Sequence, residues 1–194
     1  MFSALLDTCV LWPSLQRDFV LSMAVEGPYR PLWSEAILEE LKRHEELKWF
    51  KRGKEPADSR NRADRLIHLM RTHFDDALVT GWEPLEGTFA LPDPDDEHVV
   101  AAAVIGGAGA IVTENFKDIR RGLVPSHIDL LSVQEFAANT ADVDPTRAAK
   151  VLHELSQRHT EPARTPEQLL EVLVDRYKMT DVAEIIRPAL CGGP

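Results

Sequence analysis

The stretch of residues 91–119, LPDPDDEHVVAAAVIGGAGAIVTENFKDI, constrains the fold of this chain more than any other. A group of acidic residues runs directly into the small apolar series VVAAAV, which favours a buried helix. Glycines then interrupt the pattern, and the run AIVT is typical of a short strand. We therefore expect the acidic first turn of a helix to face the polar end of the next strand. The polar residues are Asp93, Asp95, Asp96 and Glu97 before the helix, and Glu114, Asn115 and Asp118 after the strand.

The chain up to residue 139 alternates short apolar runs with helical patterns. Residues 3–6 form an apolar run ending at Asp7, as expected for a buried strand that carries a carboxylate at its carboxyl end. Residues 53–62 are polar and are expected to form a loop or helix connection. This order predicts a small α/β sandwich with a parallel sheet. Further strands are predicted at residues 29–33, 77–80, 110–113 and 128–131, and further helices at 13–26, 34–47, 65–74 and 132–139.

From residue 142 onward the sequence favours helices only. Residues 144–145, Asp-Pro, are typical of a helix start, and residues 165–168, Thr-Pro-Glu-Gln, match a capping box with proline at the first helical position. A third helix is predicted at residues 181–187. We therefore expect one α/β domain over residues 1–140 and a helical C-terminal subdomain over residues 141–194.

Composition limits the location and the binding partners. No apolar run reaches the roughly 18 to 20 residues that a membrane span needs, so we expect a cytoplasmic protein without membrane contact. Cys9 and Cys191 lie near opposite ends of the chain without CxxC spacing, which supports neither a disulfide framework nor a zinc site. The net charge of −10 argues against nucleic-acid binding over the whole surface. Residues 42–71, however, carry ten Lys and Arg against five Asp and Glu, which makes one basic segment.

The acidic stretch has two interpretations. In the structural one, Asp93 caps the helix, Pro94 occupies its first position, and Asp95 and Asp96 complement the helix dipole. In the functional one, carboxylates from several elements meet at one edge of the sheet. Carboxylates that converge in this way suit Mg²⁺ or Mn²⁺, which prefer oxygen ligands. The residues brought together would be Asp7 after the first strand, Glu39 or Glu40 on the helix after the second, Asp96, and Asn115 and Asp118 after a later strand.

Four separated motifs, taken in order over residues 3–138, resemble those of the PIN-domain nucleases, most closely the VapC-type toxins of bacterial toxin–antitoxin pairs. They are Asp7 in LLDTCVLWP, Glu40 in WSEAILEEL, Asp96 in LPDPDDEHVVAAAVIGGAGAIVT, and the ending TENFKD at residues 113–118. The resemblance implies a three-layer α/β/α sandwich with a central parallel sheet, extended here by C-terminal helices. It also implies a Mg²⁺- or Mn²⁺-dependent endoribonuclease.

The resemblance further implies which residues form the site. Asp7, Glu40, Asp96 and Asp118 would be catalytic, and the same four with Asn115 would bind metal. Glu40 fits the family pattern better than Glu39, and Asp93 could support Asp96. Many PIN domains carry an aspartate where this chain has Asn115, which leaves open whether one or two metal ions bind. A non-catalytic PIN-like module that binds RNA or protein is therefore the alternative.

Partners are also implied by the resemblance. The substrate would be RNA, and a cognate antitoxin protein would restrain the enzyme. The C-terminal helices could dock that antitoxin, contact RNA or form a homodimer. The basic segment could guide the RNA backbone through Lys42, Arg43, Lys51 and Arg52. Trp49 and Phe50 could stack on bases, but packing into the core is the simpler expectation for both.

Three further features receive structural interpretations. The glycines at residues 106–109 follow a helix and precede a strand, so they are expected to end the helix and not to bind phosphate. His98 is expected on the solvent-facing side of its helix. Cys9 has no evident base partner, which argues against nucleophilic catalysis.

Overall fold

The computed structural model describes residues 2–158 and 162–191. A five-stranded sheet has the order β3-β2-β1-β4-β5. Its strands are β1 (Ser3–Leu6), β2 (Arg30–Ser34), β3 (Leu78–Val79), β4 (Ala110–Val112) and β5 (Asp129–Leu131). The predicted α/β class, with a central parallel sheet and additional C-terminal helices, is confirmed.

The pairing of β1 with β4 positions the ends of both strands. The two strands are parallel, with Leu6 opposite Val112, and both are completely buried, as strands covered on both faces usually are. Asp7 and Thr113 directly follow these two residues in the chain. The register therefore brings both side chains to the carboxyl edge of the sheet.

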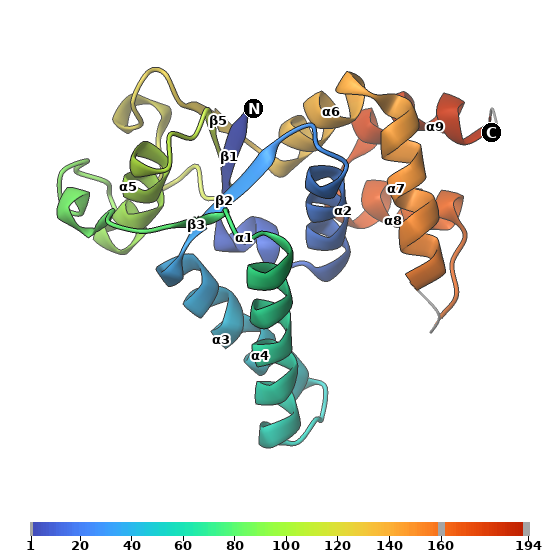
Figure 1. Ribbon diagram of the computed structural model, residues 1–194, viewed down its shortest axis with the longest axis horizontal. Helices are drawn as coiled ribbons and strands as arrows, with labels where there is room; N and C mark the ends of the chain where they lie inside the picture. The colour runs from blue at the N-terminus through green and yellow to red at the C-terminus, as the bar shows by residue number, and fades with distance from the viewer. Residues whose placement is uncertain (1, 159–161, 192–194) are drawn as a thin grey trace. The chain divides into compact units, whose positions relative to one another are not determined.

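Residues 2–12 and 31–130 form one compact unit, which we call the sheet unit. Its longest helices, α3 and α4, pack against each other as a hairpin that extends away from the sheet (Figure 1). Ser34 caps α3 by accepting a hydrogen bond from the Ile37 backbone N–H at 3.3 Å. The helices of this unit are α1 (Thr8–Leu11), α3 (Glu35–Lys51), α4 (Pro56–His73) and α5 (Glu97–Ile105), with short 3-10 turns η1 (Glu83–Leu85), η2 (Pro94–Asp96) and η3 (Arg121–Leu123).

Helix α5 is buried around most of its circumference and packs against β1 and β4. It ends at Gly106, as predicted, and only glycine fits at this position. A Cβ atom at Gly106 would lie 2.8 Å from Val79 Cγ2 and 3.0 Å from Leu32 Cδ1. Gly107 follows with a φ of 63°, a conformation that glycine adopts readily.

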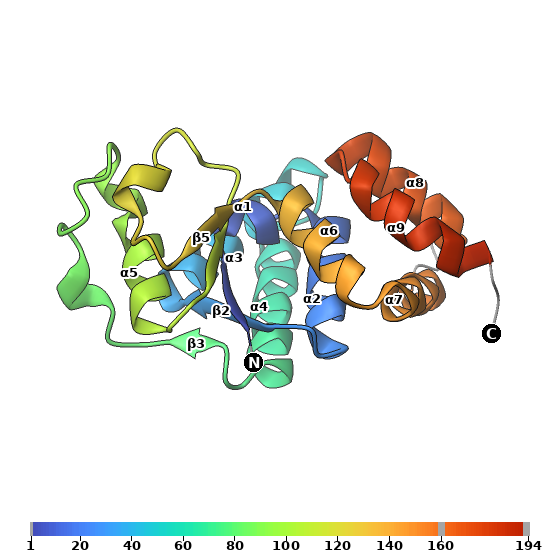
Figure 2. The same ribbon diagram turned by 90° about the horizontal axis from the view of Figure 1, so that it is seen from above.

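The remaining residues, 13–30 and the described residues from 131 onward, form a second compact unit, which we call the helical unit. Here α2 packs against α6, α7 and α8, while α8 and α9 lie side by side (Figure 2). Capping boxes begin α6 and α8, the second of them at Thr165 as predicted. The division predicted after residue 140 stays a prediction. The helices are α2 (Ser14–Val25), α6 (Val133–Val143), α7 (Pro145–Arg158), α8 (Pro166–Tyr177) and α9 (Thr180–Cys191).

Two predictions for the hairpin were wrong. Residues 56–62, predicted to lie in a connection, belong to α4, because Pro56 occupies a helix-starting position. Helix α3 likewise continues past residue 47 to Lys51. None of the helices in the described ranges is long and apolar enough to cross a membrane.

Candidate metal centre

Asp7 is a buried carboxylate held by residues at the end of β4 and the start of α1. Its backbone N–H donates to the Val112 carbonyl at 3.1 Å, continuing the β1–β4 ladder. Its side chain is held from both sides: Oδ1 accepts from the Thr8 backbone N–H at 2.6 Å, and Oδ2 accepts from the Thr113 hydroxyl at 2.6 Å. The Cys9 thiol also donates to Oδ2, at 3.2 Å. Three donors therefore fix the orientation of this carboxylate.

Asp96 is the residue at which several carboxylates meet. Burial and the negative charges of Asp7, Asp93 and Asp118 raise the pKa of Asp96 to about 6. The side-chain amide of Asn115 donates to Asp96 Oδ2 at 2.8 Å and acts in the opposite direction. Asp96 is therefore a carboxylate whose ionised form lacks sufficient positive partners within the protein.

A three-carboxylate cluster surrounds Asp96. Ligand oxygens of Asp93, Asp96 and Asp118 all lie within 4.8 Å of one another, and no other group of this kind was found among the described residues. Asp93 Oδ1 also accepts from the Asp95 backbone N–H at 3.0 Å. The predicted cap is thus confirmed, although it begins the 3-10 turn η2 and α5 starts only at Glu97. This stretch therefore contains both the capping aspartate of the structural interpretation and a cluster of carboxylates that could hold a metal ion.

Glu40 is held by two side chains on neighbouring elements. Its Oε2 accepts from the Thr8 hydroxyl at 2.7 Å, and its Oε1 lies 3.3 Å from His98 Nε2. Burial acts to raise the pKa of Glu40, but the hydrogen bonds from His98 and Thr8 outweigh it and lower the pKa. Burial likewise acts to lower the pKa of His98, and the contact with Glu40 reverses the direction. The pair therefore favours a charged Glu40.

The solvent-facing position predicted for His98 is wrong. Its relative exposure is only 5%, because α5 is covered on nearly all sides and leaves its first turn little solvent-facing surface. The ring lies 5.9 Å from that of Trp82, and Nδ1 is buried without a hydrogen-bond partner among the described residues. The apolar series after His98 was the sequence signal for its burial.

A pocket of about 320 Å³ joins most of these groups. It brings together four of the five predicted metal ligands, whereas Asp118 approaches Asp96 through the carboxylate cluster. Sequence reasoning missed Thr8, which contacts Asp7 and Glu40, and the pocket-lining His44; only Thr8 is signalled, by its place directly after Asp7. The pocket is lined by Asp7, Thr8, Cys9, Trp12, Glu40, His44, Asp96 and Asn115.

The chemistry of the pocket argues against a thiol nucleophile. Burial and the charge of Asp7 raise the pKa of Cys9 to about 12, so its thiol stays protonated near neutral pH. The oxygen-rich donor set fits a hard divalent cation instead. A cation at the carboxylate cluster would also relieve the repulsion that raises the pKa of Asp96.

This combination of a parallel sheet with carboxylates at its carboxyl edge defines an α/β protein with a candidate metal site. A family model described as "PIN domain" matches residues 3–117, more than half of the chain. The chain therefore belongs to the PIN-domain family, whose members are generally metal-dependent nucleases. Neither a curated protein nor a solved structure matches the chain.

Proposed function

We propose that the protein is a metal-dependent endoribonuclease that hydrolyses RNA phosphodiester bonds, and that it is the toxin of a toxin–antitoxin pair. The observation that carries the nuclease proposal is the cluster of Asp93, Asp96 and Asp118 in a PIN-domain chain. The raised pKa of Asp96 supports it, because a carboxylate held near like charges is suited to receive a cation.

Asp96, Asp118, Asp7, Glu40 and Asn115 would hold Mg²⁺ or Mn²⁺. A bound ion of this kind supplies Lewis-acid polarisation of a phosphate oxygen and lowers the pKa of a bound water. The chain itself orients the ligands. Thr113 and Thr8 hold Asp7 and Glu40 in place, while Asn115 holds Asp96 without adding another negative charge.

The α3–α4 hairpin supplies the positive charge that an RNA backbone needs. Arg43, Lys51 and Arg52 are exposed on it. Lys42 Nζ lies 2.6 Å from Asp64 Oδ1, so this lysine would contribute less than the other three. We propose that these side chains attract RNA to an otherwise acidic protein, which would make binding strongly dependent on salt.

The remaining parts of the proposal rest on the family resemblance. A cognate antitoxin would neutralise the enzyme in the cytoplasm, and the helical unit is available for docking that antitoxin, for RNA or for a homodimer. A non-catalytic PIN-like module is the second candidate. The observation in its favour is Asn115, a neutral amide whose nitrogen faces Asp96.

Cleavage of a mixed RNA pool tests the proposal. Wild type should cleave with Mn²⁺ or Mg²⁺ and lose activity with a chelator, and Asp96→Asn should be at least a hundredfold slower. Asp95→Asn is the matched control, because Asp95 lies outside the carboxylate cluster and is exposed. Equal activity of wild type and Asp96→Asn would contradict the site. No cleavage by wild type with any metal would favour the binding module.

A further inference from the structure

We propose that the pocket between α3 and α4 binds an unpaired base of single-stranded RNA and so contributes to substrate choice. This α3–α4 pocket has a volume of about 380 Å³, within the range of small-ligand sites. The inference rests on the proposed nuclease function and adds a base-binding subsite to it. The residues that carry it are Arg43, Leu47, Phe50, Ser59 and Arg60.

An exposed aromatic side chain forms part of the pocket wall. Phe50 is 57% exposed and Leu47 is 54% exposed. Core packing of Phe50, the simpler expectation from sequence, is therefore wrong, because α3 extends beyond the sheet (Figure 1). The neighbouring Trp49 differs, since the guanidinium groups of Arg52 and Arg62 lie 5.1 and 4.5 Å from its ring centroid. Phe50 is thus an exposed aromatic side chain on which a base can stack.

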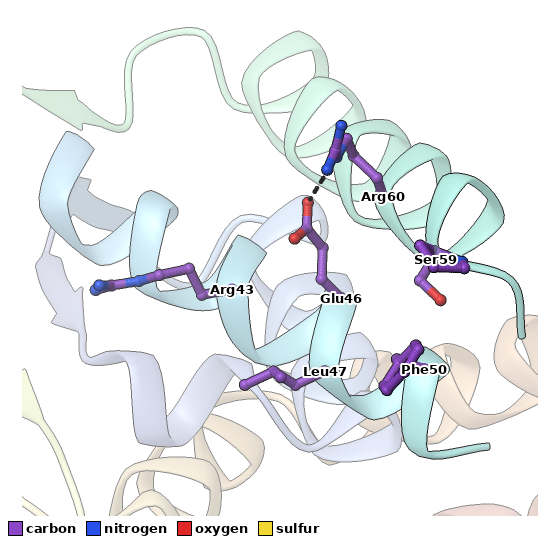
Figure 3. A pocket seen from close by; sticks show the side chains of 7 residues that line it. Arg43, Glu46, Leu47, Phe50, Ser59 and Arg60 are labelled. Atoms are coloured by element: carbon purple, nitrogen blue, oxygen red, sulfur yellow. Dashed lines mark ion pairs between the residues drawn. The ribbon is translucent and has the colours of Figure 1, made fainter. Parts of the chain in front are cut away.

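Two arginines, one on α3 and one on α4, also line the pocket. In Figure 3 the Arg43 side chain extends away from Phe50, and that of Arg60 is directed toward Glu46. Arg43 makes no hydrogen bond or ion pair with any described residue. Arg60 reaches only Glu46, with 3.8 Å between Nε and Oε1, and its side chain is largely exposed. An exposed pair at this distance contributes little. Both exposed arginines attract phosphate groups, so the surroundings of the pocket favour a nucleic-acid strand over an apolar small molecule.

A hydroxyl group at the pocket wall lacks a partner. Ser59 is 2% exposed, and its Oγ has no hydrogen-bond partner among the described residues. Figure 3 shows this oxygen directed from α4 toward the side on which Phe50 lies. An unsatisfied buried hydroxyl costs free energy. The edge of a base carries both donors and acceptors, so a base that enters beside Phe50 can satisfy it.

Helix α3 connects this pocket with the metal centre. Glu40, Arg43, Leu47 and Phe50 follow one another at spacings of three and four residues, which places them on one helix face. At ~1.5 Å per residue, Phe50 lies about 15 Å along the helix axis from Glu40. That distance corresponds to roughly two to five nucleotides, since a stacked strand advances ~3.4 Å per nucleotide and an extended one further. The bound base would therefore lie a few nucleotides from the cleaved bond.

Binding of fluorescein-labelled single-stranded RNA to the full chain tests the pocket. All proteins carry Asp96→Asn so that the RNA stays intact. Phe50→Ala should weaken binding about five- to a hundredfold, and Phe50→Trp should retain it. Leu69→Ala is the matched control, because Leu69 is an exposed apolar residue of α4 outside the pocket. Circular dichroism verifies that each variant is folded.

Abasic substitutions locate the base. One nucleotide at a time is replaced along the RNA, and a single position a few nucleotides from the cleavage site should lose affinity. That loss should disappear in Phe50→Ala, because base and ring act as a pair. Equal losses at every position, or an equal effect of Phe50→Ala on double-stranded RNA, would contradict a base pocket.

The outcomes separate the pocket from the proposed function. If the protein with native Asp96 cleaves RNA and Phe50→Ala leaves both KM and cleavage positions unchanged, base binding by the pocket is contradicted and the nuclease proposal is supported. If the native protein neither binds nor cleaves RNA, both fail. An acidic peptide that binds through Phe50 when RNA does not would replace the proposed occupant.

Discussion

The side-chain amide of Asn115 donates a hydrogen bond to Asp96 at 2.8 Å, across the gap between the strand end of β4 and the start of α5. The position at which many PIN domains carry a carboxylate thus acts here as a neutral donor. It reduces repulsion around Asp96, which already lies close to Asp93 and Asp118. Substitution of Asn115 tests how this contact affects both the repulsion around Asp96 and the affinity for a metal ion.

Replacing Asn115 with aspartate should lower stability without metal, and bound metal should offset that loss. Asn115→Asp removes a donor and adds a negative charge, so the metal-free protein should lose about 1 kcal/mol, or ~2–4 °C in Tm. With Mn²⁺ the new carboxylate should bind the ion and restore or exceed the wild-type Tm. Thermal unfolding in EDTA and in Mn²⁺ measures both. A Tm loss of equal size in both buffers would argue against a metal at this site.

The raised pKa of Asp96 predicts a pH dependence of stability. The folded state holds the Asp96 proton with a pKa of about 6, against 3.8 for an ordinary aspartate. The stability that protonated Asp96 contributes is fully present below pH 3.8 and is lost as pH rises through about 6. The ionised group therefore destabilises the metal-free fold at neutral pH. Asp96→Asn should therefore be more stable than wild type at pH 7.5 in EDTA.

Urea unfolding at pH 4 and pH 7.5 checks this dependence. The difference between Asp96→Asn and wild type should shrink toward zero at pH 4, where wild-type Asp96 is protonated. Asp95→Asn provides the reference for removing an exposed charge nearby. A constant difference between the two pH values would contradict the raised pKa.

His98 should act by positioning Glu40. His98→Ala removes the contact to Glu40 Oε1 and leaves a small cavity, so it should reduce cleavage about tenfold or more and destabilise the fold by about 1–3 kcal/mol. His98→Gln retains a donor and should recover a large part of kcat without a matching change in KM. Steady-state kinetics and unfolding of the two variants test this role. If His98→Gln recovers stability but not kcat, His98 contributes only to packing.

Thr113 should determine how well Asp7 is fixed. Thr113→Val keeps the shape of a fully buried side chain but removes the 2.6 Å hydrogen bond to Asp7 Oδ2. We expect a loss of about 1–2 kcal/mol in unfolding free energy together with weaker Mn²⁺ binding. Thr140→Val is the matched control, because the buried Thr140 hydroxyl donates instead to the Phe136 carbonyl in the helical unit. Equal loss of metal affinity in both variants would contradict a role for Thr113 in positioning Asp7 for metal binding.

Sequence patterns predicted most of this architecture because its signals are local. Short apolar runs in the sequence identify the strands. Each candidate carboxylate follows or precedes one of the predicted elements, as Asp7 follows β1, so the order of the elements predicts which carboxylates meet. The capping role of Asp93 was likewise readable from its neighbours. These features depend on residues within a few positions of one another.

The contacts that join elements could not be read in the same way. The Glu40–His98 and Thr8–Glu40 contacts depend on how α3 and α5 approach the sheet, which one sequence does not specify. Phe50 is a large apolar residue of the kind usually found in a core, but it is exposed because α3 extends beyond the sheet. The approach of Asp118 to Asp93 and Asp96 likewise joins the turn after β4 to the residues before α5.

Mn²⁺ binding to the metal-free protein tests the central claim, an ion-binding centre at Asp96, most directly. Electron paramagnetic resonance titration should show saturable binding to wild type and to Asp95→Asn with the same affinity. Asp96→Asn should bind at least tenfold more weakly, because it lacks the carboxylate between Asp93 and Asp118. Equal Mn²⁺ affinity in wild type and Asp96→Asn would contradict the account.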